Sequence, residues 1–477
     1  MMRRSRGQKT SWSAGRWPIG AASLLLLGAL SAGSGATAEE TPSGSAVDAK
    51  VDAKRSDAER LDEVETKVDV LAAELSKALT AQGVPEDRGQ MGKFGLGPTA
   101  SKVYYRDKGL SIGSYGEVLL KVNTQDKHVG GGQFEPVDDI FDALRAVLYL
   151  GFKFNDQWVV NSELEFEHAG TGGGGSVSVE FLTVDYMARD WLNFRVGLVL
   201  IPMGIINELH EPTTYFGGNR PFTEQRIIPT TWRENGGGLL GTIAGRVHYR
   251  AYAVNGLDAG GFSAAGFRGG RQKGSRALSN HWAFVGRLDV DIVDGLMAGG
   301  SVYAGQSGQD QLSCAAACDT TPVIVPIPDT PTFIYELHAL YQDHGFKVRA
   351  LFSQSFLQDT RLLNFALGNL VNNPQTQVAE QMLGTYGEIG YDVMPLLWKD
   401  TKQSLSPFFR FEYIDTQQKM SAFAVANPLF KQKIYTVGLD YKPIPQIVFK
   451  VDYNHVTPES NVADVTNYVN FGVGYVF

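Results

Sequence analysis

The last eleven residues constrain the fold more than any other segment of the chain. Bulky apolar side chains lie on one face of this segment and small or polar ones on the other, the two sets being Val469, Phe471, Val473, Tyr475 and Phe477 against Asn470, Gly472 and Gly474. Such alternation is typical of a transmembrane β-strand that faces lipid outside and water inside. A half-buried strand of a soluble sandwich has the same pattern, so this segment alone leaves both folds open.

The start of the chain predicts export from the cytoplasm. An apolar run at residues 19–30 follows five cations, and Ala36-Thr37-Ala38 stands before Glu39; the cations are Arg3, Arg4, Arg6, Lys9 and Arg16. We interpret residues 1–38 as a secretory signal peptide. Since Arg3-Arg4 lacks the rest of a twin-arginine motif, the general secretory route is expected. No other apolar run is long enough to predict a membrane helix.

The composition suits strands that show only one face to lipid. Charged residues make up 20% and aromatic residues 11% of the chain, with 54 Gly and only 2 Cys, a balance that favours an outer-membrane barrel. Removal of the five signal-peptide cations from the net charge of -8 leaves -13 for the mature chain. Any attraction for anions must therefore be local to a pore.

Residues 39–97 have a different, helical pattern. Apolar residues recur at alternating spacings of three and four, namely Leu61, Val64, Val68, Leu71, Leu75 and Ala78. This heptad stripe predicts a short periplasmic helix followed by a linker. Two interpretations remain open: a self-associating coiled coil, or a single amphipathic helix that caps the periplasmic mouth of a barrel.

The remainder, residues 98–477, predicts an all-β transmembrane antiparallel barrel of about 16 strands. The candidate strands are residues 110–123, 143–154, 158–168, 177–187, 192–201, 236–243, 247–255, 282–292, 296–306, 332–342, 346–356, 380–391, 407–416, 433–441, 447–455 and 467–477. Their connections alternate between short and long, as in outer-membrane barrels. Such a sheet must close because an open edge would leave backbone groups unpaired in lipid. The phase of residues 177–187 is irregular, which predicts a bulge.

The longest connection, residues 202–235, carries a family resemblance. The strand ending Val196-Gly197-Leu198-Val199-Leu200-Ile201-Pro202-Met203-Gly204, the long third loop and the Phe-terminated last strand resemble the phosphate-selective porin O/P family over residues 109–477. In that family the third loop folds into the lumen and narrows it. The resemblance therefore implies that Arg220, Arg226 and Arg233 line a constriction, where guanidinium groups bind oxyanions such as phosphate.

A second interpretation of these arginines is structural. The same loop holds Glu208, Glu211, Glu224 and Glu234, and in this interpretation the arginines pair with carboxylates and fix the shape of the loop. The constriction candidates are thus Arg220, Arg226, Arg233, Glu208, Glu211 and Glu234. The inward strand positions are also mixed, with Arg195, Arg250, Arg287, Arg349, Arg410 and Lys450 set against several acids. Such mixed charge suits broad passage of small polar solutes.

Other motif matches carry little weight. Gly236, Gly238 and Gly241 have dinucleotide-binding spacing but open a strand instead of a helix. Cys314 and Cys318 are close in an exported chain, which favours a local disulfide. The eight His form no metal-ligand spacing and accompany no hydrolase arrangement. We therefore expect no enzyme activity, no cofactor, no metal and no nucleic-acid partner.

The sequence as a whole predicts a porin in the outer membrane of a Gram-negative bacterium, with its N-terminal segment in the periplasm. We expect a homotrimer that contacts outer-membrane lipids and lipopolysaccharide and passes small hydrophilic solutes or ions by passive diffusion. The alternative is an envelope structural protein, in which the barrel is an anchor and the helix contacts other periplasmic components.

Overall fold

The structure is a computed structural model, and it describes part of the chain. The described residues are 66–69, 92–124, 127–129, 133–135, 137–170, 172, 174–314, 323–369, 375–459 and 466–477. The chain divides into two compact units, residues 1–72 and 73–477. Residues 66–69 are helical, as the heptad stripe predicts. The rest of that predicted helix and the whole predicted signal peptide lie outside the described residues, so both stay predictions.

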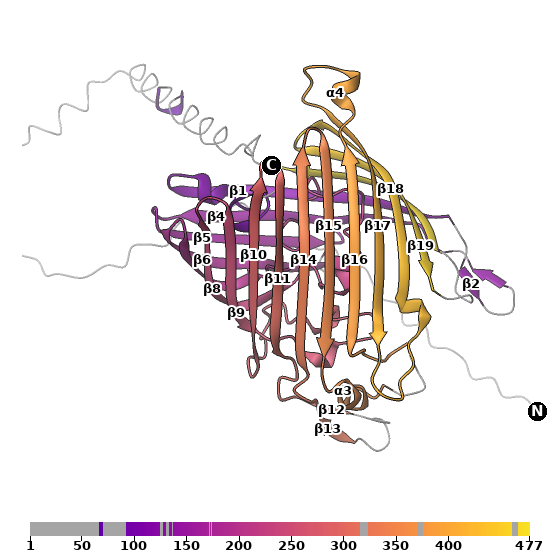
Figure 1. Ribbon diagram of the computed structural model, residues 1–477. Coiled ribbons are helices and arrows are strands. Elements are labelled where there is room, and N and C mark those ends of the chain that lie inside the picture. Colours follow the sequence, from indigo (N-terminus) through magenta and orange to yellow (C-terminus); the bar gives the residue numbers. More distant parts are fainter. Residues whose placement is uncertain are drawn as a thin grey trace, which may run out of the picture. The chain divides into compact units, whose positions relative to one another are not determined.

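Sixteen antiparallel strands close into one barrel, which confirms the predicted fold class (Figure 1). The strands are β1 (Gly109–Asn123), β4 (Ile140–Lys153), β5 (Trp158–Glu167), β6 (Ser176–Arg189), β7 (Leu192–Leu200), β8 (Arg233–Ile243), β9 (Val247–Asn255), β10 (Trp282–Val293), β11 (Leu296–Gln306), β14 (Pro331–Asp343), β15 (Phe346–Leu357), β16 (Gln381–Tyr391), β17 (Ser404–Lys419), β18 (Lys431–Ile444), β19 (Ile447–Pro458) and β20 (Thr466–Val476). Each overlaps one predicted strand. The sequence pattern therefore located every strand of the wall.

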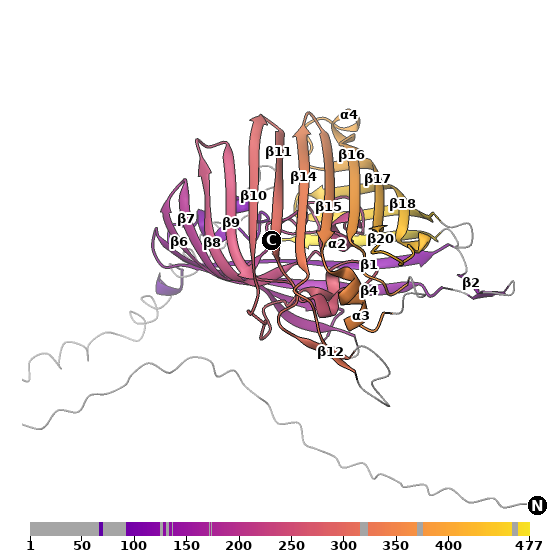
Figure 2. The ribbon, with the colours of Figure 1, turned by 60° about the horizontal axis from the view of Figure 1, so that its bottom comes forward.

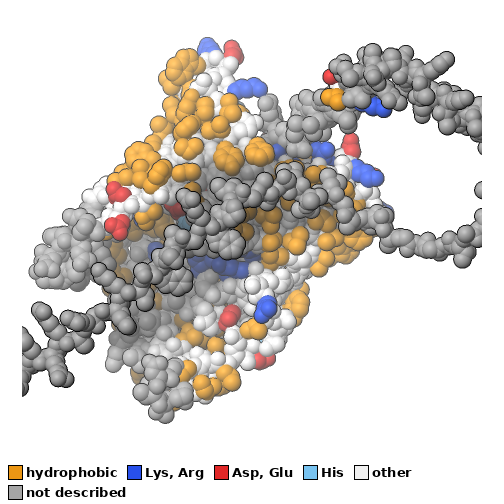
Figure 3. All heavy atoms as spheres, turned by 180° about the vertical axis from the view of Figure 1, so that it is seen from behind, with side chains coloured by type: hydrophobic (Ala, Val, Ile, Leu, Met, Phe, Trp, Pro, Cys, Tyr) orange, Lys and Arg blue, Asp and Glu red, His pale blue; other side chains and the backbone are white. Residues whose placement is uncertain are grey.

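The C-terminal strand completes the closure. β20 pairs with β1, with Phe471 opposite Leu120. Phe471 is 49% exposed on the outer wall whereas its neighbour Asn470 is fully buried in the lumen. Figure 3 shows hydrophobic side chains gathered over the barrel wall on the face it presents. An apolar outside and a polar inside are what a bilayer and an aqueous lumen require.

The predicted bulge in the fourth barrel strand is present. Along the β5–β6 pair, Glu163 stands opposite Phe181 but the next residue, Leu164, stands opposite Val179. Glu180 is the extra residue, and its side chain is fully buried. A bulge of this kind places two successive side chains on one face. Glu180 therefore points into the lumen, where an unbroken alternation would have turned it toward lipid.

Long and short connections lie at opposite ends of the barrel. In Figure 1, α3 (Thr360–Ala366) and the hairpin of β12 (Leu312–Cys314) and β13 (Ile324–Pro326) lie at one end, and α4 (Met394–Leu397) at the other. The long-loop end also holds the hairpin of β2 (Lys127–Val129) and β3 (Gln133–Glu135), and the short elements η5 (Ala259–Gly261), η6 (Arg268–Gly270) and η7 (Pro428–Phe430). Among the described residues, no helix is long and apolar enough to cross a membrane.

Residues 92–105, which precede β1, pack inside the barrel at its short-turn end, against β1 and β4, which run side by side in Figure 2. This segment contains η3 (Lys93–Gly95) and η4 (Lys102–Tyr105), and η4 contacts β1, β4 and β5. Gly151 on β4 permits the close approach, because a Cβ there would lie 2.7 Å from Val103. The linker that the sequence predicts to end near residue 97 is thus followed by a segment that occupies the barrel mouth.

Candidate functional site

The third long loop, residues 201–232, folds into the lumen and crosses it. Its ends are adjacent, since the backbone N–H of Ile201 donates to the carbonyl of Trp232 at 3.0 Å. This bond continues the β7–β8 ladder, so β8 begins at Arg233, three residues earlier than predicted. Arg233 and Glu234 consequently belong to the wall, and the loop proper is two residues shorter than the predicted residues 202–235.

The first half of the loop is held by apolar packing. Its side chains join a buried cluster with aromatic residues of β11 and of the next long loop; members of the cluster are Ile201, Met203, Ile206, Trp232, Tyr303 and Phe267, all fully buried. Burial of each such side chain stabilises the structure by roughly 1.5–3 kcal/mol. This part of the lumen is therefore a packed core and holds the loop in place.

The second half of the loop is held by cations of the opposite wall. Lys450 on β19 donates to the carbonyls of Tyr215 and Gly217, both at 2.9 Å. Arg410 on β17 donates to the carbonyl of Asn219 at 3.0 Å. Two more wall cations, Arg349 and Lys442, donate to the carbonyls of Thr214 and Thr213. Charged donors make strong hydrogen bonds, and here they bind main-chain atoms.

Acids of the same wall bind the backbone N–H groups of the loop. Gly218 donates to Asp452 on β19 at 2.6 Å, and Thr223 donates to Glu412 on β17 at 3.1 Å. The wall therefore presents alternating donors and acceptors that match the peptide groups of the loop, much as a strand would.

Glu224 joins the two halves of the loop to each other and to the wall. It lies in the short helix α2 (Thr223–Arg226). One of its oxygens accepts from the backbone N–H of Ile206 and the other from the hydroxyl of Tyr386 on β16, each at 2.6 Å. Burial raises the pKa of Glu224 to about 7, although both hydrogen bonds oppose the rise.

The segment of residues 92–105 meets the loop from the other end of the barrel. Glu211 of the loop accepts hydrogen bonds from the backbone N–H groups of Thr99 and Ala100 at 2.9 and 3.2 Å. Tyr104 donates to Asp185 on β6 at 2.6 Å and accepts from Arg195 on β7 at 2.8 Å. Hydrogen bonds thus join the loop to this segment inside the barrel.

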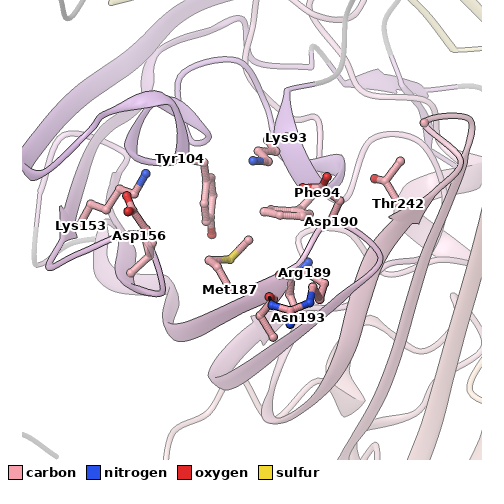
Figure 4. A pocket seen from close by; sticks show the side chains of 13 residues that line it. Lys93, Phe94, Tyr104, Lys153, Asp156, Met187, Arg189, Asp190, Asn193 and Thr242 are labelled. Atoms are coloured by element: carbon pink, nitrogen blue, oxygen red, sulfur yellow. Dashed lines mark hydrogen bonds between the residues drawn. The ribbon is translucent and has the colours of Figure 1, made fainter.

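A polar pocket of about 410 Å³ opens beside the segment at the short-turn end (Figure 4). Tyr104 and Met187 stand in its middle, with Lys153 and Asp156 on one side and Lys93 and Asp190 on the other. Burial lowers the pKa of Lys93. Both signs of charge line the pocket, so it favours neither anions nor cations by composition.

The predicted constriction residues occupy different environments. Glu208 lies 3.3 Å from Arg250 and 3.9 Å from Arg287. Arg233 pairs with Glu180 at 2.9 Å, and Arg226 donates to Gln432 at 2.8 Å. Glu211 caps the segment described above, Glu234 accepts from Asn255 on β9 at 2.7 Å, and Arg220 is half-buried. Among these described residues, no arginine of the loop pairs directly with a glutamate of the same loop.

The six predicted pore-lining cations all point into the lumen and are all buried; they are Arg195, Arg250, Arg287, Arg349, Arg410 and Lys450. Four of them pair with acids on their own or a neighbouring strand at 2.7–3.0 Å, namely Arg195–Asp185, Arg250–Asp289, Arg287–Asp289 and Arg410–Glu388. Arg287 also binds the carbonyl of Gly204 in the loop. Their hydrogen-bonding capacity is thus directed to the loop and to wall acids.

Sequence reasoning missed the cluster around His210. His210 of the loop lies against Glu163 and Glu180, three residues whose ligand atoms fall within 4.8 Å of one another. Spacing along the chain gave no sign of it, because the three residues come from two strands and a loop. The Pro-flanked sequence Glu208-Leu209-His210-Glu211-Pro212 was the available signal, and the irregular phase of β6 was another.

The predicted disulfide lies partly outside the described residues. Cys314 is disulfide-bonded, whereas Cys318 is not among the residues that the structure describes. The pairing of the two stays a prediction.

Comparison with known proteins identifies one relative and several similar folds. No protein-family model matches the chain. An uncharacterized protein of Aquifex aeolicus (strain VF5) is 34% identical over 368 residues, covering 75% of this chain and 78% of that protein. Salmonella typhi OmpF is 11% identical with a TM-score of 0.49, covering 78% of this chain and 98% of that one. The channel DcaP of Acinetobacter baumannii is 12% identical with a TM-score of 0.47, covering 77% and 98%. An anion-selective porin from Comamonas acidovorans is 11% identical with a TM-score of 0.46, covering 78% and 100%.

Proposed function

We propose that this chain, which belongs to the same family as the uncharacterized Aquifex aeolicus protein, is an outer-membrane channel for passive diffusion of small hydrophilic solutes. The observation that carries the proposal is a closed 16-strand barrel whose third long loop crosses the lumen on fixed contacts. A barrel of this size has a lumen wide enough for water. The loop then sets the size of what passes.

The lumen favours size selection over strong charge selection. Its buried cations pair with acids or bind loop carbonyls, as Arg410 and Lys450 do. Phosphate selectivity requires guanidinium or ammonium donors that are free to replace the solute's water. We therefore propose weak ion selectivity, and we do not extend the phosphate preference of the resembling family to this chain.

The location in the outer membrane rests on two observations. Apolar side chains cover the barrel exterior, with Phe471 and Trp282 49% and 56% exposed, and the sequence starts with a predicted signal peptide. We propose that the short-turn end and the segment before β1 face the periplasm, since short turns lie there in bacterial barrels. A homotrimer remains part of the proposal, and chemical cross-linking of intact membranes tests it.

Single-channel recording tests the proposed function. Protein folded in detergent is added to a planar bilayer under a salt gradient, first in chloride and then in phosphate. We expect stepwise conductance with a reversal potential close to zero in both salts. A large reversal potential would contradict weak selectivity while keeping the channel.

The packed lumen supports one other function. Apolar packing around Trp232 and the contacts of residues 92–105 fill space that an open pore would leave to water. A barrel filled in this way also suits an envelope anchor. Folded protein that inserts into the bilayer and gives no conductance steps would favour the anchor and reject the channel.

A further inference from the structure

Two buried carboxylates converge on one ring nitrogen of His210. Nε2 of His210 lies 3.1 Å from an oxygen of Glu163 on β5 and 3.2 Å from an oxygen of Glu180 at the β6 bulge. The side chains of both acids are 0% exposed and that of His210 is 2% exposed. The three groups belong to the wall and the loop, and they meet only because the loop folds inward.

The imidazole ring is oriented by its other nitrogen. Nδ1 of His210 lies 3.0 Å from the carbonyl oxygen of Asn207, which can only accept, so Nδ1 carries a proton. In the neutral ring Nε2 then bears a lone pair that faces the two carboxylates. A hydrogen bond from one ring nitrogen to a backbone carbonyl is the usual support of a metal-binding histidine.

Each of the two carboxylates has one oxygen that makes no hydrogen bond. One oxygen of Glu180 is held by Thr231 at 2.7 Å and Arg233 at 2.9 Å, and the Glu163 oxygen that faces Nε2 also accepts from Tyr115 at 3.2 Å. The second oxygen of each acid is buried and makes no hydrogen bond. That includes the Glu180 oxygen that lies 3.2 Å from Nε2. Buried unpaired carboxylate oxygens are costly, so a cation is expected to satisfy them.

The acidic residues around the cluster also favour a bound cation. Glu165, two residues along β5, is a third buried acid in this part of the lumen. Of the cations nearby, Arg233 contacts Glu180, whereas Arg145 binds Glu117 and the hydroxyl of Tyr215. These acids outnumber the one guanidinium that contacts them, so the cluster holds a surplus of acidic groups that a bound cation would reduce.

We propose that Glu163, Glu180 and His210 form a binding site for a divalent transition metal that ties the loop to the wall. Ligand atoms about 2.1 Å from a metal lie roughly 3.0 Å apart in an octahedral site and 3.4 Å apart in a tetrahedral one. The observed separations of 3.1 and 3.2 Å from Nε2 fall in this interval. One imidazole with two carboxylates suits Zn²⁺, Mn²⁺, Fe²⁺ or Co²⁺.

A second histidine of the lumen shows what a non-binding arrangement looks like. His338 on β14 also contacts two buried acids, but Asp289 lies 2.9 Å from Nε2 and Glu336 lies 2.9 Å from Nδ1. Arg287 also reaches Nε2, at 3.1 Å. Each ring nitrogen faces its own acid, and the Arg287 guanidinium places a positive charge beside Nε2, so neither nitrogen is left for a metal ion. His338 is therefore a matched control for His210.

The test is the metal content of the untagged, folded protein. After removal of metal with EDTA, wild-type protein is titrated with Zn²⁺ or Co²⁺ alone and the bound metal is counted by mass spectrometry. We expect about one ion per chain in the wild type and in His338→Gln. The count should fall below about a tenth in Glu163→Gln/His210→Asn and in Glu180→Gln/His210→Asn.

Two further measurements keep the proposal open to refutation. His281→Gln removes a second, largely exposed group, formed by His281 with Asp310 and Asp329, and the lumenal ion should remain in that variant. X-ray absorption of the wild-type zinc form needs no variant to fold, and one imidazole with oxygen ligands is expected. Wild-type protein that binds no stoichiometric metal, or metal lost with His281 alone, would overturn the site and leave His210 as a protonated partner of its acids.

Discussion

The two sides of the lumen hold the same loop by different chemistry. On the β15–β19 side, wall cations such as Lys450 bind main-chain carbonyls of the loop. On the β5–β6 side, wall acids bind a loop side chain, the imidazole of His210. Contacts to carbonyls do not depend on which residues the loop carries, whereas the His210 contact does. On the first side, substitution of a wall residue should therefore destabilise the loop more than substitution of a loop side chain. On the second side, the two substitutions should have similar effects.

The largest effect is expected from Arg410→Ala. Arg410 is fully buried, and its loss takes the nearest cation from Glu388 and Glu412 and a donor from the Asn219 carbonyl. Removal of one partner from such a buried network costs about 3–5 kcal/mol. Guanidinium unfolding in detergent micelles, followed by tryptophan fluorescence, should show that loss. An unchanged midpoint would break the claim that wall cations hold the loop.

The next largest effect is expected from Glu224→Gln, which should change how the stability of the protein depends on pH. Burial raises the pKa of Glu224 in the folded state to about 7, so the folded chain holds a proton that the unfolded chain releases above its ordinary pKa of about 4.5. The contribution of Glu224 to the stability of the wild type is therefore fully present below pH 4.5 and is lost as the pH rises to 7. The variant lacks this fall, and its stability relative to the wild type should grow by about 3 kcal/mol over that range.

The control for this pH effect is Glu459→Gln, at an exposed glutamate on the long-loop rim. It should leave the stability curve close to that of the wild type, because Glu459 is largely exposed and its one ion pair, with Lys431, is a surface pair. Parallel curves for wild type and Glu224→Gln between pH 4.5 and 7 would contradict the assignment of the titration to Glu224.

A smaller effect is expected from Asn219→Ala. The side chain of Asn219 makes one hydrogen bond, to Tyr468 at 3.1 Å, while its carbonyl binds Arg410. The variant loses only the side-chain bond, worth about 1 kcal/mol. Single-channel conductance should stay at the wild-type level. A loss of stability as large as that of Arg410→Ala would mean that loop side chains, and not its backbone, fix its position.

The smallest effect is expected from Lys431→Gln at the rim. Lys431 and Glu459 form an ion pair at 2.5 Å whose side chains are 35% and 60% exposed. Solvent-exposed pairs of this kind contribute little to stability. Neither the unfolding midpoint nor the conductance should move, which makes this variant the baseline for Arg410→Ala.

The wall of the barrel was predictable and the interior largely was not. Alternation with a period of two marks each strand, as at Phe471 and Val473, because one face must meet lipid. Even the bulge at Glu180 left a trace as an irregular phase. The contacts of the loop left none, since carbonyls have no sequence signature and residues 47 and 30 positions apart, Glu163 and Glu180, meet His210 only after folding.

The central claim, that the loop sets the pore, is tested most directly by its removal. Residues 203–230 are replaced with a four-residue Gly-Asn-Gly-Ser turn, which the Ile201–Trp232 hydrogen bond permits because the ends are adjacent. Single-channel conductance of this variant is compared with the wild type in the same salt. The account predicts a several-fold larger unit conductance, since the lumen of a 16-strand barrel then holds water. Equal conductance in the two proteins would contradict it.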